Sequence, residues 1–159
     1  MTEWCVDASV AVKWAVAGEP FRAKARAFLK DAGTKSIRLI APPYFVSEVD
    51  SAIRKRVFDG KMIAAEAKKA FAILDAAPVV TIDMPGLRQR AREIAEQSNQ
   101  RFVYDATYAA LADLRGCEFW TADKLFYDAI RTMLPFVKYL PDYPEPLSPS
   151  QVIDQKTNE

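Results

Sequence analysis

Short apolar segments alternate along the chain with longer segments in which apolar residues recur at helical spacing. The short segments have the length of buried strands, and the spacing in the longer ones is typical of helices with one apolar face. The predicted strands span 4–7, 37–41, 79–82, 118–121 and 136–139, and the predicted helices span 10–16, 44–59, 61–76, 85–98, 104–112 and 125–133, with a further helix that opens at Pro20. Strands that alternate with helices predict an α/β fold, with a central parallel sheet flanked by helices on both faces.

The C-terminal end departs from this pattern. Four prolines lie between positions 141 and 149, and proline lacks the backbone donor that regular structure needs. We therefore expect a single domain over residues 1–140 and a Pro-rich, extended C-terminal tail over residues 141–159. A single domain also suits a chain of 159 residues with 50% apolar residues, which is long enough to bury a core without disulfides.

The composition excludes several kinds of chemistry. The chain has no histidine, so Ser-His-Asp and Cys-His hydrolysis, imidazole-bound zinc and a histidine general base are all excluded. A metal held by side chains must then be a hard cation on carboxylate oxygens, which means Mg²⁺, Mn²⁺ or Ca²⁺. Neither glycine-rich phosphate-binding motif occurs, which argues against a nucleotide-binding version of the fold. The net charge of +1 does not indicate an obligate polyanion binder, although it is compatible with local basic patches.

Cysteine usage and the N-terminal sequence bear on location. Cys5 and Cys117 have no metal-binding spacing and lie in or next to apolar sequence, so we expect free thiols in a reducing compartment. The first residues do not form a basic region followed by an apolar stretch, and no apolar run approaches the roughly 18 residues of a membrane span. These features predict a cytoplasmic protein that has no membrane partner.

Four acidic residues stand at equivalent places in the predicted elements. Asp7 ends the first strand, and Asp123 follows two residues after another strand. Glu48 lies in the first turns of a helix, and Asp105 lies at the start of another. In parallel sheets the carboxyl ends of the strands share one edge, where helix N-termini also point and where binding sites form. We therefore expect the four carboxylates to lie around one pocket.

Each of these acids also has an ordinary structural interpretation. Asp7 and Asp123 suit the N-cap position of a helix, where an acceptor oxygen is preferred. Glu48 and Asp105 suit the positive end of a helix dipole. Two carboxylates about 4 Å apart repel by about 4 kcal/mol at an effective dielectric near 20, so four of them around one pocket need a compensating cation. Spacing alone leaves both interpretations open.

Four segments that contain the acids resemble the motifs of PIN-domain ribonucleases, especially the VapC-type toxins of bacterial toxin–antitoxin pairs. They read VDASVAVKW at 6–14, SEV at 47–49, YDATYAALA at 104–112 and TADKL at 121–125. The order and the separations of 41, 57 and 18 positions between successive acids fit the family. The resemblance covers about residues 3–140, and all four of its acidic positions are occupied. It therefore implies an active, single PIN-like domain.

The resemblance implies a metal-dependent endoribonuclease that uses Mg²⁺ or Mn²⁺ to activate water against RNA phosphodiesters. The catalytic acids would be Asp7, Glu48, Asp105 and Asp123. Of these, Asp7, Asp105 and Asp123 would bind the ion, while Glu48 would either bind it or hold a water molecule on it. Carboxylate-held metal supports this chemistry without histidine, because it lowers the pKa of bound water and offsets charge on the phosphate.

Residues around the acids have possible supporting roles. The hydroxyls of Ser9 and Thr121 would orient the ligands, although a helix cap and a strand end explain these residues equally well. Candidate RNA contacts are Lys13, Arg54, Lys55, Arg56 and Lys124, each of which also suits an ordinary solvated surface. Trp14 and Tyr104 are candidates for stacking on bases, with core or interface packing as the alternative for Trp14.

The resemblance also implies partners: an RNA substrate, a cognate antitoxin protein and a second copy of the chain in a homodimer. The residues that would form the dimer are Phe58, Met62, Ile63 and Phe71, with ordinary core packing as the alternative. Two other functions compete with the nuclease. One is a non-catalytic PIN-fold module that binds RNA or protein, which the loss of an acid would favour. The other is a phosphoacceptor domain of the response-regulator type, which usually has adjacent acids early in the chain, whereas Asp7 has none beside it.

Overall fold

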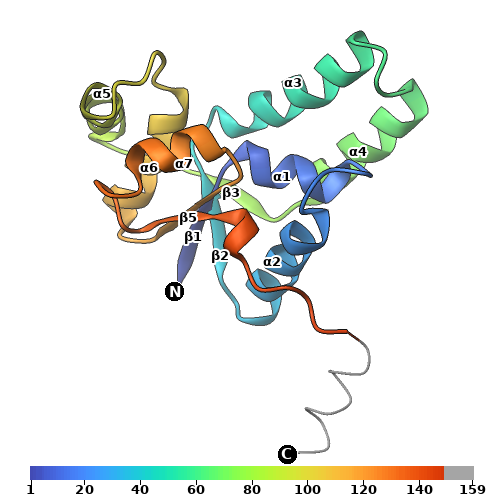
Figure 1. Cartoon of the computed structure of the whole chain (residues 1–159), viewed down its shortest axis with the longest axis horizontal. Helices are drawn as coiled ribbons and strands as arrows, with labels where there is room; N and C mark the ends of the chain where they lie inside the picture. Colours follow the sequence, from blue (N-terminus) through green and yellow to red (C-terminus); the bar gives the residue numbers. More distant parts are fainter. Residues whose placement is uncertain (149–159) are drawn as a thin grey trace, which may run out of the picture.

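The structure is a computed structural model that describes residues 1–148. Within these residues the chain forms five strands and seven α-helices (Figure 1). The strands are β1 (Glu3–Val6), β2 (Arg38–Ala41), β3 (Val79–Thr81), β4 (Glu118–Thr121) and β5 (Val137–Tyr139). The helices are α1 (Ala8–Ala15), α2 (Arg22–Thr34), α3 (Phe45–Phe58), α4 (Ala64–Ala76), α5 (Leu87–Gln97), α6 (Tyr104–Arg115) and α7 (Lys124–Ile130). In this part of the chain no helix is both long and apolar enough to cross a bilayer.

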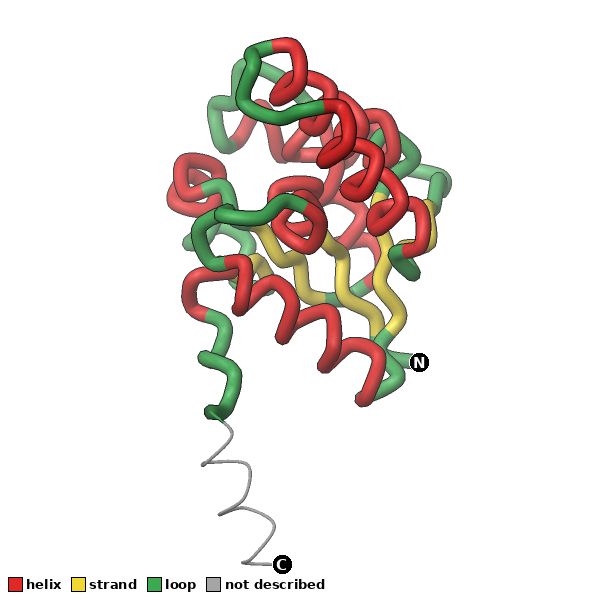
Figure 2. Tube along the Cα trace, turned by 90° about the vertical axis from the view of Figure 1, so that its right-hand side faces the viewer, coloured by secondary structure: helices red, strands yellow, loops and turns green. Residues whose placement is uncertain are grey.

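The strands form one parallel sheet in the order β3-β2-β1-β4-β5, so that β1 is central (Figure 2). Cys5 pairs with Ile40 of β2 on one side and with Phe119 of β4 on the other. The ladder continues one residue past β1, because the backbone N–H of Asp7 donates to the carbonyl of Trp120 at 3.0 Å. The predicted α/β fold with a central parallel sheet is confirmed, and all five strands end at the same edge.

Helices cover both faces of the sheet, which is seen nearly edge-on in Figure 1. On one face the rings of Trp4 and Trp120 pack on Phe28 of α2, with ring centres 4.9 and 5.6 Å apart. On the other face Phe119 packs on Tyr108 of α6 at 5.9 Å. Neighbouring strand residues thus point to opposite faces, and both faces are buried, as continuous apolar strands require.

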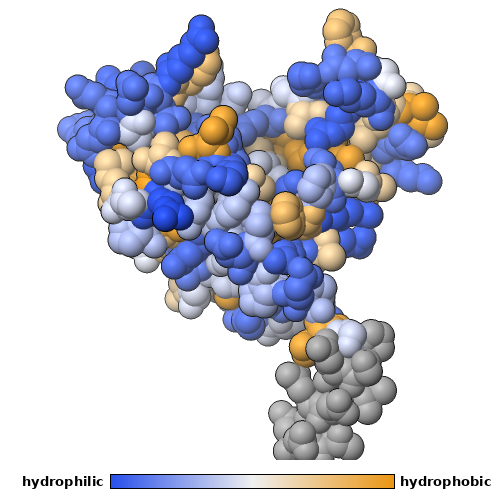
Figure 3. Space-filling view, viewed as in Figure 1, coloured by the Kyte–Doolittle hydropathy of each residue, from blue (hydrophilic) through white to orange (hydrophobic). Residues whose placement is uncertain are grey.

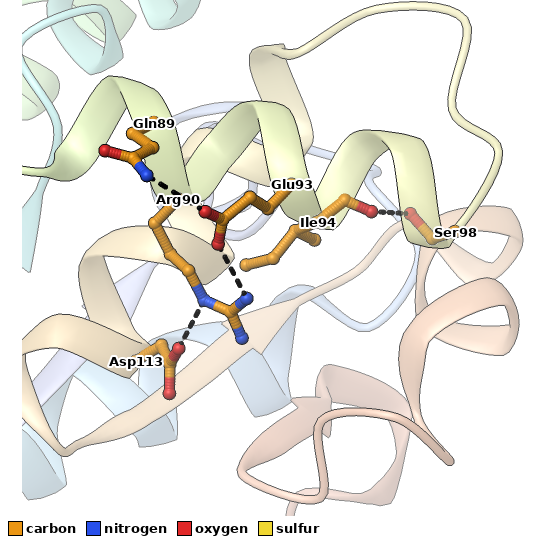
Figure 4. Close-up of polar contacts among 6 residues, drawn as sticks. All are labelled: Gln89, Arg90, Glu93, Ile94, Ser98 and Asp113. Carbon is orange, nitrogen blue, oxygen red and sulfur yellow. Dashed lines mark hydrogen bonds and ion pairs between the residues drawn. The ribbon is translucent and has the colours of Figure 1, made fainter.

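Helices α5 and α6 form a tight pair on the second face. Both helices carry small buried residues, such as Ala91 of α5 and Ala109 of α6, and the two helices are in close contact. Figure 4 shows Arg90 of α5 directed at Asp113 of α6, with Nε 2.6 Å from the carboxylate, and also bonded to Glu93 on its own helix. This contact therefore joins the start of α5 to the end of α6.

Several helix boundaries differ from those that the sequence predicts. The second helix begins at Arg22 and not at Pro20, because Phe21 adopts a left-handed backbone conformation with φ of 60°. The helix expected from 85 begins at Leu87, since Gly86 is also left-handed, with φ of 84°. The helix expected over 125–133 ends at Ile130, and turns follow it, with the N–H of Met133 donating to the carbonyl of Ile130 at 3.0 Å.

The C-terminal segment is packed further than predicted. A 3₁₀ turn spans Leu140–Asp142, and the ring of the buried Tyr143 lies edge-on against Phe28 and Trp120 at 5.6 and 5.2 Å. The hydroxyl of Tyr143 donates to the carboxylate of Asp31. Positions 141–143 are therefore packed on the core, because one aromatic side chain anchors the turn, and Glu145 still forms an ion pair with Lys24 of α2 at 3.4 Å. Residues 149–159 of the predicted tail lie outside the described residues.

Candidate metal centre

Three carboxylates from distant parts of the sequence meet at the carboxyl edge of the sheet. Asp7 directly follows β1, Glu48 lies in the first turn of α3, and Asp105 lies in the first turn of α6. One oxygen atom of each carboxylate lies within 4.8 Å of the corresponding atoms of the other two. Figure 1 shows the end of β1 and the starts of α3 and α6 close together above the sheet. The parallel topology thus brings three of the four predicted acids together.

The carboxylate of Asp7 is held by two hydroxyls on one oxygen only. Its Oδ2 accepts hydrogen bonds from Ser9 Oγ at 2.9 Å and from Thr121 Oγ1 at 2.7 Å. These hydroxyls are fixed in turn, because they accept hydrogen bonds from the backbone N–H groups of Ala122 and Asp123 at 3.0 and 3.1 Å. Both side chains therefore orient Asp7, as the sequence suggested, and Thr121 is fully buried while it does so.

The other oxygen of Asp7, Oδ1, is buried and has no hydrogen-bond partner among residues 1–148. Leaving a buried carboxylate oxygen unpaired is costly, so such an atom calls for a partner that the polypeptide does not supply. A hard divalent cation is the partner that suits it, since two further carboxylates offer oxygens within 4.8 Å. The donor set therefore fits Mg²⁺ or Mn²⁺.

The two aspartates that precede helices use their side chains differently. Asp7 stands at the N-cap position of α1, but its side chain makes no capping hydrogen bond. Asp123 stands at the N-cap of α7, and its Oδ1 accepts from the backbone N–H of Phe126 at 3.1 Å. The cap interpretation therefore describes Asp123 and not the side chain of Asp7.

Asp123 also lies outside the group of three carboxylates whose oxygens are within 4.8 Å. Its negative charge nevertheless raises the pKa of Asp7 and that of Asp105, so it stands near the group. The sequence interpretation placed Asp123 among the ligands and left Glu48 either on the ion or behind it. Of these two residues, Glu48 has an oxygen within 4.8 Å of those of Asp7 and Asp105, and Asp123 does not belong to that close group.

Tyr108 is a member of this site that the sequence interpretation missed. It is buried, and its hydroxyl donates to Glu48 Oε2 at 3.4 Å. It lies three positions after Asp105, so both side chains share one face of α6. That spacing was visible in the sequence, but the position of Glu48, 60 residues earlier, was not.

Burial and mutual repulsion raise the pKa values of the three carboxyl groups. Burial is the main cause in each case, and neighbouring charge adds to it. The pKa of Glu48 is raised to about 8, with the charges of Asp7 and Asp105 as further causes. The pKa of Asp105 is raised to about 7, and that of Asp7 is also raised. The raised values agree with the prediction of crowded acids, although desolvation contributes more than the repulsion on which that prediction rested.

Comparison with known families decides the identity of the fold. The sequence model described as the PIN domain matches residues 4–131. The chain belongs to the PIN-domain family. PIN domains are generally nucleases and typically use divalent metal ions, which agrees with the cluster of Asp7, Glu48 and Asp105.

A solved structure supports the same fold. The crystal structure of PAE2754 from Pyrobaculum aerophilum superimposes on this PIN domain with a TM-score of 0.60. The match covers 84% of this chain and 93% of the other, at 19% sequence identity. No curated protein sequence matches the chain.

Two of the five basic residues proposed to contact RNA line a cleft beside the acids. Lys13 and Arg56 border a cavity of about 300 Å³ that Glu48 also lines. Burial lowers the pKa of Lys13, and the nearby charge of Arg56 lowers it further, against the opposing effect of Glu19. The guanidinium of Arg56 is bonded to Glu19 at 2.6 Å, so its side chain is held at the cleft.

The other candidate RNA contacts have different surroundings. Lys55 forms an ion pair with Asp59 at 2.5 Å, and Lys124 forms one with Asp128 at 2.8 Å. In each case the partner lies four positions later in the sequence. Arg54 lines a groove between α3 and α4. Of the aromatic candidates, Trp14 is buried and its indole N–H donates to the carbonyl of Ala25 at 2.9 Å, so it is a core residue and does not stack on bases. Tyr104 is half exposed.

The hydroxyl of Thr121 is expected to matter for stability as well as for the site. Replacing Thr121 by Val keeps the shape but leaves Asp7 Oδ2 with one donor and the N–H of Asp123 without its acceptor. We expect the free energy of unfolding, measured with urea, to fall by about 1–3 kcal/mol. The control Thr107→Val removes an exposed hydroxyl bonded only to Val103 and should change it by less than about 0.5 kcal/mol. Equal stability of the Thr121 variant and the parent would contradict this role.

Proposed function

We propose that this PIN domain is a metal-dependent endoribonuclease whose Mg²⁺ or Mn²⁺ ion is held by Asp7, Glu48 and Asp105. The observation that carries the proposal is the buried, unpaired Oδ1 of Asp7 beside two other carboxylates within 4.8 Å. When bound, such an ion activates water as a nucleophile and offsets negative charge on the phosphate. This chemistry also suits a chain that lacks histidine.

The surrounding residues would hold the carboxylates in the positions that metal binding requires. Ser9 and Thr121 hold one oxygen of Asp7, so the other is presented in a fixed position. Tyr108 restrains Glu48 in the same way. Asp123 would act from outside the group: it holds the start of α7 and adds negative charge that favours a cation.

The RNA backbone would be bound by the basic residues of the adjacent cleft. Lys13 and Arg56 lie on the α1 and α3 walls of this cleft, and Glu48 connects it to the carboxylate group. Long cationic side chains next to a cation site suit a phosphate chain, because they neutralise the phosphates that flank the one being cleaved. Lys13 is the stronger candidate, since Arg56 already shares its charge with Glu19.

The test of this function is cleavage of a panel of structured and unpaired RNAs with Mg²⁺, with Mn²⁺ and with a chelator. We expect cleavage that appears with either ion and stops with the chelator. RNA binding without cleavage under any of these conditions would instead favour the non-catalytic module. The motif resemblance further leads us to propose that the nuclease is the toxin of a toxin–antitoxin pair in the cytoplasm, inhibited by a small antitoxin protein.

We also propose that the protein is a homodimer built on α3 and α4. Phe58 and Ile63 at this end of the molecule are 78% and 65% exposed, while Met62 and Phe71 are partly buried against the core. Val57 and Phe71 line a groove of about 510 Å³ between the two helices. Exposed apolar residues next to a groove are typical of an interaction surface.

The dimer proposal makes a direct prediction about mass in solution. The parent is expected to be a dimer at micromolar concentration in light or X-ray scattering. Phe58→Asp introduces a charge that the interface would have to bury, so we expect a monomer with an unchanged circular dichroism spectrum. The control Leu114→Asp alters an exposed apolar residue on α6 and should leave the dimer intact. A parent that is monomeric at this concentration would rule the proposal out.

A further inference from the structure

Three aromatic rings are exposed next to the carboxylate group. Tyr44, Phe102 and Tyr104 are 42%, 60% and 50% exposed. Tyr44 stacks on Tyr104 with ring centres 4.9 Å apart and planes 19° from parallel, and Phe102 lies 5.9 Å from Tyr104. Rings that pack on one another in this way usually belong to a core, yet about half of this surface faces solvent.

The rings are attached directly to the elements that carry the acids. Tyr104 is the residue before Asp105 in α6. Tyr44 is the N-cap of α3, and its carbonyl accepts the backbone N–H of Glu48 at 3.1 Å. The ring cluster and the carboxylates therefore occupy neighbouring positions on the same two helix ends.

The connection that carries Phe102 is restrained by hydrogen bonds. At its start the backbone N–H of Gln100 donates to the carbonyl of Ala95 at 2.8 Å. At its end Thr107 Oγ1 donates to the carbonyl of Val103 at 2.8 Å. Figure 4 shows Ser98, at the start of this connection, donating from Oγ to the carbonyl of Ile94 at 2.6 Å. The exposed rings are thus presented by an ordered segment, which lowers the entropy lost on binding.

Figure 3 shows a hollow between two projections at the top of the molecule, one at the α5–α6 connection and one at the α3–α4 end. In the same view the end of β1 lies below this hollow (Figure 1). A chain that reaches the carboxylates through the hollow passes the projection that carries the α5–α6 connection.

We infer that Tyr44, Phe102 and Tyr104 form a stacking site for unpaired nucleobases of the RNA strand next to the scissile phosphate. Aromatic faces are the surfaces that proteins offer to unpaired bases, and they accept every base because each has a π-face. The guanidinium of Arg101 lies 5.3 Å from the ring centre of Phe102, which places a cation where a phosphate chain would run. The inference rests on the proposed function for its choice of RNA, and it narrows the substrate to single-stranded segments.

The test measures binding of a fluorescent, unpaired RNA oligomer of roughly 12 nucleotides to the whole protein, with Ca²⁺ in place of the catalytic ion. We expect Phe102→Ala and Tyr44→Ala each to weaken binding by about tenfold, the usual effect of losing one stacked ring. A duplex of the same sequence and an oligomer of abasic nucleotides should bind parent and variants equally. Affinity for Mn²⁺, measured by calorimetry, should be unchanged. The control Leu114→Ala removes an exposed apolar side chain at the opposite end of α6 from Tyr104 and should leave RNA affinity unchanged.

Several results would overturn the inference. These are a parent that binds no unpaired RNA, ring variants that bind the oligomer as tightly as the parent, and equal losses for the unpaired, duplex and abasic strands. Ring variants that change the mass in solution while RNA affinity stays the same would identify a protein interface instead. Cleavage of RNA by the parent in Mn²⁺ is measured as well, so that a failure of the stacking site can be told from a failure of the proposed nuclease function. A parent that binds through the rings but never cleaves refutes only the nuclease, whereas a parent that cleaves but whose ring variants bind normally refutes only the stacking site.

Discussion

Replacing Asp7 by Asn is expected to lower the rate of RNA cleavage by about three orders of magnitude. Asn can still accept the hydrogen bonds of Ser9 and Thr121, so the side chain keeps its place. It loses the negative charge that a hard divalent ion requires. Stabilisation of the transition state by such an ion is worth several kcal/mol, and each 1.4 kcal/mol corresponds to a tenfold change in rate. Single-turnover cleavage of one RNA at fixed Mn²⁺ concentration measures this loss.

Asp123→Asn is the matched control for this experiment. Asn is as good an N-cap as Asp, so the hydrogen bond to the N–H of Phe126 survives. Because Asp123 lies outside the close group, we expect a smaller loss of roughly 10- to 100-fold, typical of residues behind the ligands. Both variants should unfold within about 1 kcal/mol of the metal-free parent. Equal losses in the two variants would contradict the proposal that Asp7 binds the ion and Asp123 does not, and full activity of the Asp7 variant would contradict the site itself.

Added Mg²⁺ or Mn²⁺ is expected to raise the melting temperature by about 5–10 °C at pH 8. An ion at a hundred times its dissociation constant stabilises the native state by about 2.7 kcal/mol, and each kcal/mol corresponds to about 2–4 °C in a chain of this size. The gain should shrink as the pH falls from 8, because protons compete with the ion for Glu48 and Asp105, whose pKa values are raised to about 8 and about 7. Differential scanning calorimetry at several pH values measures both effects.

The stability of the metal-free protein should follow the opposite trend with pH. The pKa of Glu48 is about 8 in the folded state against an ordinary value of 4.5, and that of Asp105 is about 7 against 3.8. Folding then favours the protonated forms, so this contribution is fully present only below the ordinary values of 4.5 and 3.8 and is lost progressively as the pH rises to about 8. Glu48→Gln removes one of the two groups and should flatten the profile and reduce the gain from metal. A melting temperature that does not change with millimolar Mg²⁺ or Mn²⁺ at pH 8 would argue against the proposed metal site.

The fold was predictable because its signals are local. Each strand is a short apolar run, and each helix shows its own spacing, so the alternation of strands and helices predicts the parallel sheet. The predicted boundaries are wrong where a single backbone conformation or a contact between distant residues determines where an element begins or ends. Because Phe21 and Gly86 have left-handed backbone conformations, two helices begin later in the sequence than predicted. Tyr143 packs on Phe28, which lies more than a hundred positions earlier in the sequence, and this contact holds the start of the predicted tail against the core.

The four acids were predictable as a set, but the sequence does not show which three of them lie closest together. Position at a strand end or a helix start identifies Asp7, Glu48, Asp105 and Asp123 equally. Local geometry decides which carboxylate accepts a hydrogen bond from a backbone N–H. Asp123 accepts one and caps α7, while Oδ1 of Asp7 has no partner among the described residues. The contact between Tyr108 and Glu48 depends on how α6 and α3 pack, which no spacing within one segment reveals.

The most direct test of the central claim is a crystal structure of the protein soaked in Mn²⁺, with anomalous diffraction recorded to locate the ion. We expect a strong anomalous peak whose ligands include Oδ1 of Asp7 and an oxygen from each of Glu48 and Asp105, and no such peak in crystals of the Asp7→Asn variant. Density for Mn²⁺ that avoids Asp7 Oδ1, or a parent crystal with no peak among the three carboxylates, would contradict the claim.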